Sequence, residues 1–539
     1  MRKFILAATA ALLATQTSAQ APTPPKLLVV ISVDQFSANL FDEYRPQYTS
    51  GMARLASGIA FHNGYQSHAN TETCPGHSTI LTGDHPSRTG IVSNTWFDQS
   101  IARQDKTIYC AEDERASASH VANYKVSPIH LMVPTLGELM KARWPDSRSV
   151  AVSGKDRAAV MMSGHKVDQR WYWDGVRFTT DQSGAPVPKV IERANAAITA
   201  ALAQPLPPLD PPPYCQSKAR AVALEGGGKP VGTGQFARAA NDRNEFRASP
   251  EIDGDTLAVA AGLVDEMQLG RRASPDILAI SLSATDYIGH TYGTEGEEMC
   301  LNMFSLDREI GDFLRVLDSR GLDYTVVLTA DHGGKDIPER ERLAGVPGAA
   351  RVDAGLQADR IGPAIASRFG LTSFGITGGN FGDMYVDRTL SPSDRQRVLD
   401  AAVAEYRSSP QVEAVFTADQ LARTPVSTAP PEQWSMIERV RANYYPGRSG
   451  DFYVVLKKDI TPIADTSRGS AATHGSPWDY DRRVPILFWQ PGETGTTIEH
   501  SAETTDILPT LASMIGLPVA PGSIDGHCLS DVPGAACPR

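Results

Sequence analysis

Apolar residues gather in short runs along this chain. Residues 26–33, 277–282 and 325–329 are near-continuous apolar segments. Runs of this length are expected of strands that are buried on both faces of a parallel sheet. Helices are predicted between them at 255–267 and 298–318. The order of these elements indicates an α/β protein built on a mostly parallel sheet.

Polar residues follow these strands directly. Asp34 follows the first strand, Asp286 and His290 follow the second, and Asp331-His332 follows the third. Because open α/β sheets bind ligands at the carboxyl ends of their strands, these side chains are expected to meet. Positions four apart on a helical turn share a face, so Asp286 and His290 could reach one metal ion. Two glycines after His332 would allow the turn that brings Asp331 and His332 to one site.

Three further segments carry polar residues whose role is open on the sequence alone. The predicted strand 149–152 is followed by Gly-Lys-Asp-Arg at 154–157, which is either a solvated loop or a pair of cations at a site. Asn94 alone would be a turn residue, although its segment could return an amide to a neighbouring site. His474 stands between small residues, and a single histidine is more often structural.

A threonine stands at the start of a predicted helix in residues 70–83, between a predicted strand at 61–67 and a turn-rich loop at 83–90. Pro75 is tolerated in the first turn because its missing N–H would be unpaired there. Thr73 would then lie at the positive helix end, which suits an alkoxide attacking a phosphoryl group. An N-cap role explains Thr73 equally well.

Together these segments supply three carboxylates, three imidazoles and one hydroxyl, a set suited to two zinc ions. The seven residues are Asp34, Thr73, Asp286, His290, Asp331, His332 and His474. Seven such residues at predicted strand ends and loops are difficult to explain as seven unrelated structural positions. A two-metal site is therefore predicted.

The order of these motifs resembles the alkaline phosphatase superfamily, and most closely its exported bacterial alkaline phosphatases with a threonine nucleophile. The matching segments are 30–35, 73–77, 93–96, 154–157, 286–290, 331–333 and 473–475. The resemblance implies a three-layer α/β sandwich with a mostly parallel central sheet. It also implies a single catalytic domain over 20–539. Pro- and Gly-rich stretches at 204–213 and 226–228, and a predicted strand-helix-strand unit over 380–417, indicate inserted cap or subdomain segments at about 160–250 and 335–460.

The resemblance implies a role for each site residue as well. The first zinc is expected to be bound by one carboxylate and two imidazoles, namely Asp286, His290 and His474. The second is expected to be bound by two carboxylates, one imidazole and the nucleophile, namely Asp34, Asp331, His332 and Thr73. Three side chains are expected to contact the phosphoryl oxygens, namely Asn94, Lys155 and Arg157.

The expected activity is hydrolysis of phosphate monoesters through phosphothreonine, with release of phosphate. Nucleotide pyrophosphatase/phosphodiesterases are the alternative, since they are similar in threonine, asparagine and metal ligands but lack the Lys and Arg pair. A monoester carries more negative charge on its transferred group, so Lys155 with Arg157 favours monoesters. Sulfatases are disfavoured because His77 stands where their motif has arginine. An inactive secreted metal-binding protein on the same scaffold is a remote alternative.

Composition limits the compartment and the partners. The 539-residue chain has a formal charge of −11, which argues against a nucleic-acid-binding surface. Residues 1–19 resemble a signal peptide, with Arg2 and Lys3 before an apolar run and small residues at the end. No later segment reaches the ~18 apolar residues of a membrane span. We therefore expect a periplasmic or secreted enzyme that acts as a monomer on small phosphate esters.

Six cysteines are compatible with disulfides in an oxidising compartment. Six cysteines allow fifteen pairings, so the connectivity stays open. Cys528 and Cys537 enclose the shortest loop. Our hypothesis for Cys74, beside the predicted nucleophile, is a disulfide that braces the turn, with Cys110 as a guessed partner.

Overall fold

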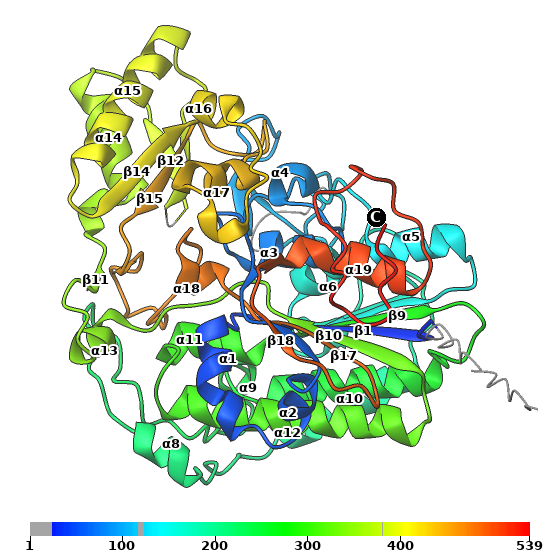
Figure 1. The fold of residues 1–539 in the computed structure, drawn as a ribbon. Coiled ribbons are helices and arrows are strands. Elements are labelled where there is room, and N and C mark those ends of the chain that lie inside the picture. The colour runs from blue at the N-terminus through cyan, green and yellow to red at the C-terminus, as the bar shows by residue number, and fades with distance from the viewer. Residues whose placement is uncertain (1–23, 117–122, 380, 539) are drawn as a thin grey trace, which may run out of the picture.

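A nine-stranded sheet runs through the centre of the molecule (Figure 1). The computed structural model describes residues 24–116, 123–379 and 381–538, so the predicted signal peptide at 1–19 lies outside the described residues. The strands, in spatial order, are β18 (Thr497–Ile498), β2 (Ile59–Phe61), β17 (Ile486–Trp489), β10 (Tyr324–Thr329), β1 (Leu27–Val33), β9 (Asp276–Leu282), β6 (Ser149–Ser153), β7 (Gln169–Trp173) and β8 (Phe178–Thr179).

The middle of this sheet is parallel. Strand β1 pairs in parallel with β9 and β10, and β6 pairs in parallel with β9 and β7. Two strands reverse direction, namely β17, which is antiparallel to β10 and β2, and β8, which is antiparallel to β7. The predicted mostly parallel sheet is confirmed. Because the central strands run the same way, the residues that follow them lie along one edge of the sheet.

Helices cover both faces of the sheet. Alternate residues of β1 point to opposite faces, so Leu27, Val29 and Ile31 join one buried apolar cluster while Leu28 and Val30 join another. The first cluster is covered by α1 (Ala38–Tyr44), α2 (Gly51–Leu55), α7 (Lys189–Leu202), α10 (Glu251–Glu266) and α12 (Glu297–Ser319). The second is covered by α3 (Thr73–Ile80), α5 (Leu136–Arg143), α6 (Asp156–Ser163) and α19 (Ile507–Met514). The predicted three-layer α/β sandwich is confirmed.

A second, four-stranded antiparallel sheet lies to one side of the sandwich, at the upper left of Figure 1. Its strands, in spatial order, are β12 (Ile376–Gly378), β13 (Gly382–Val386), β15 (Phe452–Leu456) and β14 (Val412–Thr417). Helices α14 (Ala358–Arg368) and α15 (Pro392–Ser408) pack on this sheet and share a separate apolar core with it.

Shorter elements connect these layers. The helices are α4 (Pro86–Thr89), α8 (Pro213–Lys218), α9 (Arg243–Arg247), α11 (Ala284–Tyr292), α13 (Pro338–Leu343), α16 (Ala418–Arg423), α17 (Met436–Asn443) and α18 (Asp479–Arg482). The strands are β3 (Gly64–Tyr65), β4 (Thr95–Phe97), β5 (Thr107–Tyr109), β11 (Ala350–Arg351), β16 (Ile460–Thr461) and β19 (Ala502–Glu503).

Two predicted elements differ from the structure. The strand predicted at 61–67 is divided, because β2 pairs with β17 in the central sheet whereas β3 pairs with β19 in a sheet of its own. The predicted loop at 83–90 contains α4, which starts at Pro86, ends at Thr89 and is followed by Gly90 with a φ of 75°. Proline in the first turn and glycine after the last turn are typical of a helix this short, so the local sequence carried the signal.

Three disulfides join Cys74 to Cys110, Cys215 to Cys300 and Cys528 to Cys537. The hypothesis that Cys110 is the partner of Cys74 is confirmed. This number of disulfides suggests an extracellular or periplasmic protein. Within the described ranges, no helix combines the length and the apolar character that crossing a membrane requires.

Asp307 on α12 ties this helix to α2. Its buried carboxylate accepts hydrogen bonds from the N–H groups of Thr49, Ser50 and Met52 at 2.8–2.9 Å. Because Asp307→Ala leaves these donors unpaired, we expect it to lower the free energy of unfolding by about 2 kcal/mol, measured by chemical denaturation. Asp312→Ala on the same helix removes only an exposed ion pair and is the control. Equal losses in both variants would contradict the capping role.

Candidate active site

The structure gathers six of the predicted ligands into two groups of three. The first group is Asp286, His290 and His474, and the second is Asp34, Asp331 and His332. Within each group one potential ligand atom per residue lies within 4.8 Å of the others. The carboxyl ends of β1, β9 and β10 supply five of the six residues, and the loop before α18 supplies His474. The edge of the sheet where the central strands end is therefore where the two groups form.

The three histidines are oriented by the main chain. In each of them Nδ1 lies 2.7–2.9 Å from a carbonyl oxygen, and the pairs are His290 with Ala472, His332 with Gly333 and His474 with Thr71. A proton held on Nδ1 by such a bond leaves Nε2 as an electron-pair donor. The Nε2 atoms face into the groups, since that of His474 lies 3.2 Å from Oδ1 of Asp286 and that of His332 lies 3.4 Å from Oδ1 of Asp34.

The two groups fit divalent cations. Three of their buried atoms have no hydrogen-bond partner among the described residues, namely Asp34 Oδ1, Asp286 Oδ1 and His332 Nε2. Burying a carboxylate oxygen without a partner is costly unless a cation or donor meets it. Carboxylates together with neutral imidazoles are ligands of the first-row divalent metals. Each group can thus hold one metal ion.

Lys155 lies between the two groups. Its Nζ is 2.6 Å from Oδ2 of Asp34 and also contacts Oδ2 of Asp286. Burial, reinforced by the charge of Asp331, raises the pKa of Asp34 well above its ordinary value. Burial opposes the charge of Asp286 too, but Lys155 and His290 outweigh it and hold the pKa of Asp286 well below the usual range. Burial also disfavours the Lys155 ammonium, yet Asp286 and Asp34 raise its pKa, so this side chain stays charged.

Thr73 is the first residue of α3. Glu72 occupies the N-cap position, so the alternative interpretation of Thr73 as an N-cap is wrong. The Thr73 side chain is buried, and its Oγ1 lies 3.4 Å from Nη2 of Arg157. The hydroxyl therefore sits where the N–H groups of a helix start and a guanidinium both favour negative charge.

The residues predicted to contact a phosphoryl group lie near Thr73. Lys155, only 2% exposed, precedes α6 and Arg157 lies in its first turn, so the alternative of a solvated loop is wrong. Oδ1 of Asn94 accepts a hydrogen bond from the N–H of Cys74 at 2.8 Å. The amide NH₂ of Asn94 is the end left to donate toward a ligand.

Three residues without a predicted role hold the site together. His77 lies one turn after Thr73, and its Nδ1 is 2.9 Å from the carbonyl oxygen of Thr73 and 3.0 Å from Oδ2 of Asp331. Gly76 lies so close to Asp331 that a Cβ would be 1.9 Å from the carbonyl oxygen of that residue. Asp253 on α10 accepts from the N–H groups of Ser283 and Ala284, at the start of α11. These contacts join segments that are far apart in the chain. Only the spacing of His77 from Thr73 could have been recognised in the local sequence.

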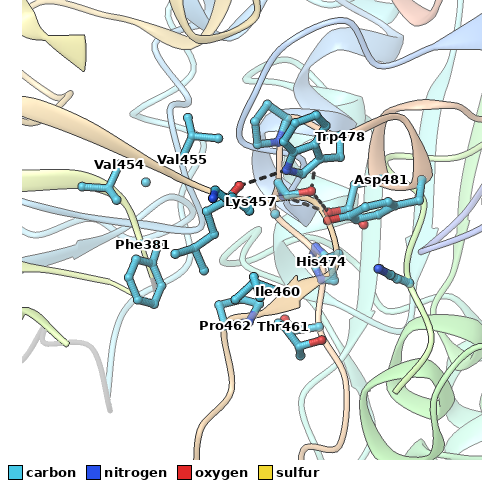
Figure 2. Close-up of a pocket in the computed structure, with 18 of the residues that line it drawn as sticks. Phe381, Val454, Val455, Lys457, Ile460, Thr461, Pro462, His474, Trp478 and Asp481 are labelled. Atoms are coloured by element: carbon cyan, nitrogen blue, oxygen red, sulfur yellow. Dashed lines mark hydrogen bonds between the residues drawn. The ribbon is translucent and has the colours of Figure 1, made fainter. Parts of the chain in front are cut away.

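A pocket opens beside His474, between the strands β15 and β16 and residues 473–481 (Figure 2). Its walls combine polar and apolar side chains, and Figure 2 shows Phe381, Ile460 and Pro462 along one side. His474, which belongs to the first metal group, thus lines a pocket at the boundary between the central sandwich and the four-stranded sheet.

Solved structures share this architecture. The alkaline phosphatase PafA superposes with a TM-score of 0.81 at 24% identity, covering 95% of this chain and 100% of its own. Murine ectonucleotide pyrophosphatase/phosphodiesterase 5 superposes with a TM-score of 0.54 at 13% identity, covering 92% and 96%. At these identities the similarity concerns the fold alone, and it defines an alkaline-phosphatase-like fold.

The sequence profile of the type I phosphodiesterase / nucleotide pyrophosphatase family matches residues 28–477, and the chain belongs to this family, within the alkaline phosphatase superfamily. Alkaline phosphatase PhoK of a Sphingomonas species is 51% identical over 95% of this chain and 92% of its own length. Alkaline phosphatase PhoD of Zymomonas mobilis is 45% identical over 95% and 89%. The resemblance expected from the motifs is confirmed.

The close approach at Gly76 predicts a strong effect of one methyl group. Gly76→Ala would force α3 away from Asp331, so we expect a loss of about 2 kcal/mol in the free energy of unfolding and a lower metal content in the purified protein. Gly348→Ala is the control because nothing lies within 4 Å of the added Cβ. Normal stability and metal content in Gly76→Ala would show that the contact is dispensable.

Proposed function

We propose that this chain is an exported alkaline phosphatase that hydrolyses phosphate monoesters through a phosphothreonine intermediate and uses two zinc ions. The observation that carries the proposal is the position of the Thr73 hydroxyl beside Arg157, at the start of a helix tied to the second metal group through His77 and Asp331. Two relatives at 51% and 45% identity are named alkaline phosphatases, which supports the proposal.

The zinc ions are assigned to the two groups by ligand chemistry. The first ion would be held by Asp286, His290 and His474, and the second by Asp34, Asp331, His332 and Thr73. When bound, such ions stabilise negative charge on attacking and leaving oxygens and lower the pKa of bound water. The buried atoms Asp34 Oδ1, Asp286 Oδ1 and His332 Nε2, which have no hydrogen-bond partner among the described residues, support this assignment.

The reaction would then proceed by two successive displacements at phosphorus. Oγ1 of Thr73 loses its proton and attacks phosphorus, the bond from phosphorus to the ester oxygen breaks, and the ester oxygen takes up a proton and leaves as the alcohol while phosphothreonine forms. Water then attacks the same phosphorus and breaks its bond to Oγ1, which releases phosphate and restores the hydroxyl. The positive end of α3 favours negative charge on Oγ1 of Thr73 as this atom attacks phosphorus and as it leaves phosphorus.

Lys155, Arg157 and Asn94 would bind the non-bridging oxygens. The Arg157 guanidinium offers a planar fork and the Lys155 ammonium a point charge, while the Asn94 amide adds a neutral donor. A monoester brings an additional negative charge into this site, so it gains more from the two cations than a diester does. Diester hydrolysis is the second candidate, favoured by the family match over residues 28–477.

The proposal extends to the organisation and location of the protein. A separate apolar core supports an inserted subdomain within residues 335–460 of a single catalytic domain over 20–539, and a second insertion is proposed at about 160–250. The three disulfides support a periplasmic or secreted location, reached through a signal peptide at 1–19. The substrates would be small phosphate monoesters and the enzyme a monomer.

Removing the nucleophile should separate binding from turnover. We expect Thr73→Ala to retain most of its zinc, because three ligands remain in each group, and to lose monoesterase activity at least about a thousandfold. Metal analysis and rate measurement on the same sample check both parts. Thr199→Ala, an exposed threonine on α7 outside the site, is the control. Substantial activity in Thr73→Ala would rule out the covalent step.

Removing either cation should change specificity. For the wild type, we expect an aryl phosphate monoester to react faster than the matching diester or sulfate. Lys155→Ala and Arg157→Ala should each lower kcat/KM for the monoester by about 10- to 100-fold, which corresponds to the free energy of a hydrogen bond to a charged group. The loss of kcat/KM for the diester should be smaller. Equal losses on both substrates would contradict the specificity argument, and a wild type that prefers the diester would favour the second candidate.

A further inference from the structure

Asp156 lies between Lys155 and Arg157 in the sequence, and both of its carboxylate oxygens accept hydrogen bonds. Its Oδ1 accepts hydrogen bonds from the hydroxyl of Tyr109 at 2.7 Å and from the N–H of Arg157 at 2.7 Å. Its Oδ2 accepts from the hydroxyl of Tyr124 at 2.5 Å. Asp156 itself is only 8% exposed. A buried carboxylate with three donors is held in one orientation.

Tyr109 lies on a strand that is attached next to the nucleophile, and Tyr124 packs against Tyr109. Tyr109 ends β5 and precedes Cys110, whose disulfide with Cys74 joins this segment to the first turn of α3. The rings of Tyr109 and Tyr124 pack against each other with centroids 4.5 Å apart. The disulfide and the two packed tyrosines thus link α3, which carries Thr73, to α6, which carries Arg157.

We propose that Tyr109, Tyr124 and Asp156 form a clamp that fixes the turn bearing Lys155 and Arg157 and thereby sets the preference for phosphate monoesters over diesters. This inference rests on the proposed function. The three members of the clamp are positioning residues that act through the two cations.

The physical reason lies in the chain itself. Residues 155, 156 and 157 are consecutive, so fixing the side chain of the middle residue fixes the backbone from which both neighbours project. A guanidinium binds two oxygens well only at the right angle, and small misplacements at a reacting centre are costly. A monoester depends on both cations more than a diester does, so a loosened turn affects the monoester more.

The test removes one hydroxyl at a time. We expect Tyr109→Phe and Tyr124→Phe each to lower kcat/KM for an aryl phosphate monoester by about tenfold and to change that for the matching diester by less than about twofold. The inhibition constant of inorganic phosphate should rise in parallel, since phosphate uses the same cations. Tyr124 is less buried than Tyr109, so its variant retains the test if Tyr109→Phe folds poorly.

Tyr324→Phe is the matched control. Its hydroxyl also donates to a carboxylate, Asp318 at 2.8 Å, but it lies at the amino end of β10, the end of the strand opposite Asp331. We expect it to lower the melting temperature as the clamp variants do and to leave the ratio of monoester to diester rates unchanged. Parallel losses on both substrates in the clamp variants, or an equal change of ratio in Tyr324→Phe, would overturn the clamp. Absence of monoesterase activity in the wild type would instead contradict the proposed function.

Discussion

Three buried carboxylates that converge at one edge of the sheet are the constraint on which the rest of the site depends. Asp34, Asp286 and Asp331 are at most 2% exposed, and their mutual repulsion is not screened by water. Such an arrangement is stable only if positive charge lies among the carboxylates. The chain supplies part of that charge through Lys155, and the unpartnered oxygen atoms show where cations would supply the rest.

The architecture follows from this constraint. The three carboxylates follow β1, β9 and β10, which are neighbours in the parallel centre of the sheet and hold these positions close together. Two apolar layers around these strands resist the repulsion at their ends. Burial of apolar side chains stabilises the sandwich. The sandwich in turn holds together the three carboxylates, which would otherwise separate.

The sequence predicted best what depends on local pattern. The apolar runs before Asp34, Asp286 and Asp331 identified the strands, and the spacing of Asp286 from His290 indicated a shared helical face. The division of the ligands into two groups followed only from family resemblance, because His474 reaches Asp286 across 188 residues of chain. The contacts of Asp253 with α11 and of Gly76 with Asp331 leave no periodic trace in the sequence, so local pattern could not reveal them.

Resemblance in the metal ligands does not by itself determine which phosphate ester is the substrate, and the turn at 154–157 shows why. Metal ligands at strand ends are common to enzymes with different substrates, because stabilising a phosphoryl group's charge is needed for monoesters and diesters alike. What separates the two substrates is one additional charge, which must be met by a side chain and not by the shared metals. That side chain needs support of its own, and in this chain the support comes from tyrosines outside the strand-end motifs. The proposed specificity thus rests on the connection that carries Tyr109 and Tyr124, while the proposed chemistry rests on the edge of the sheet.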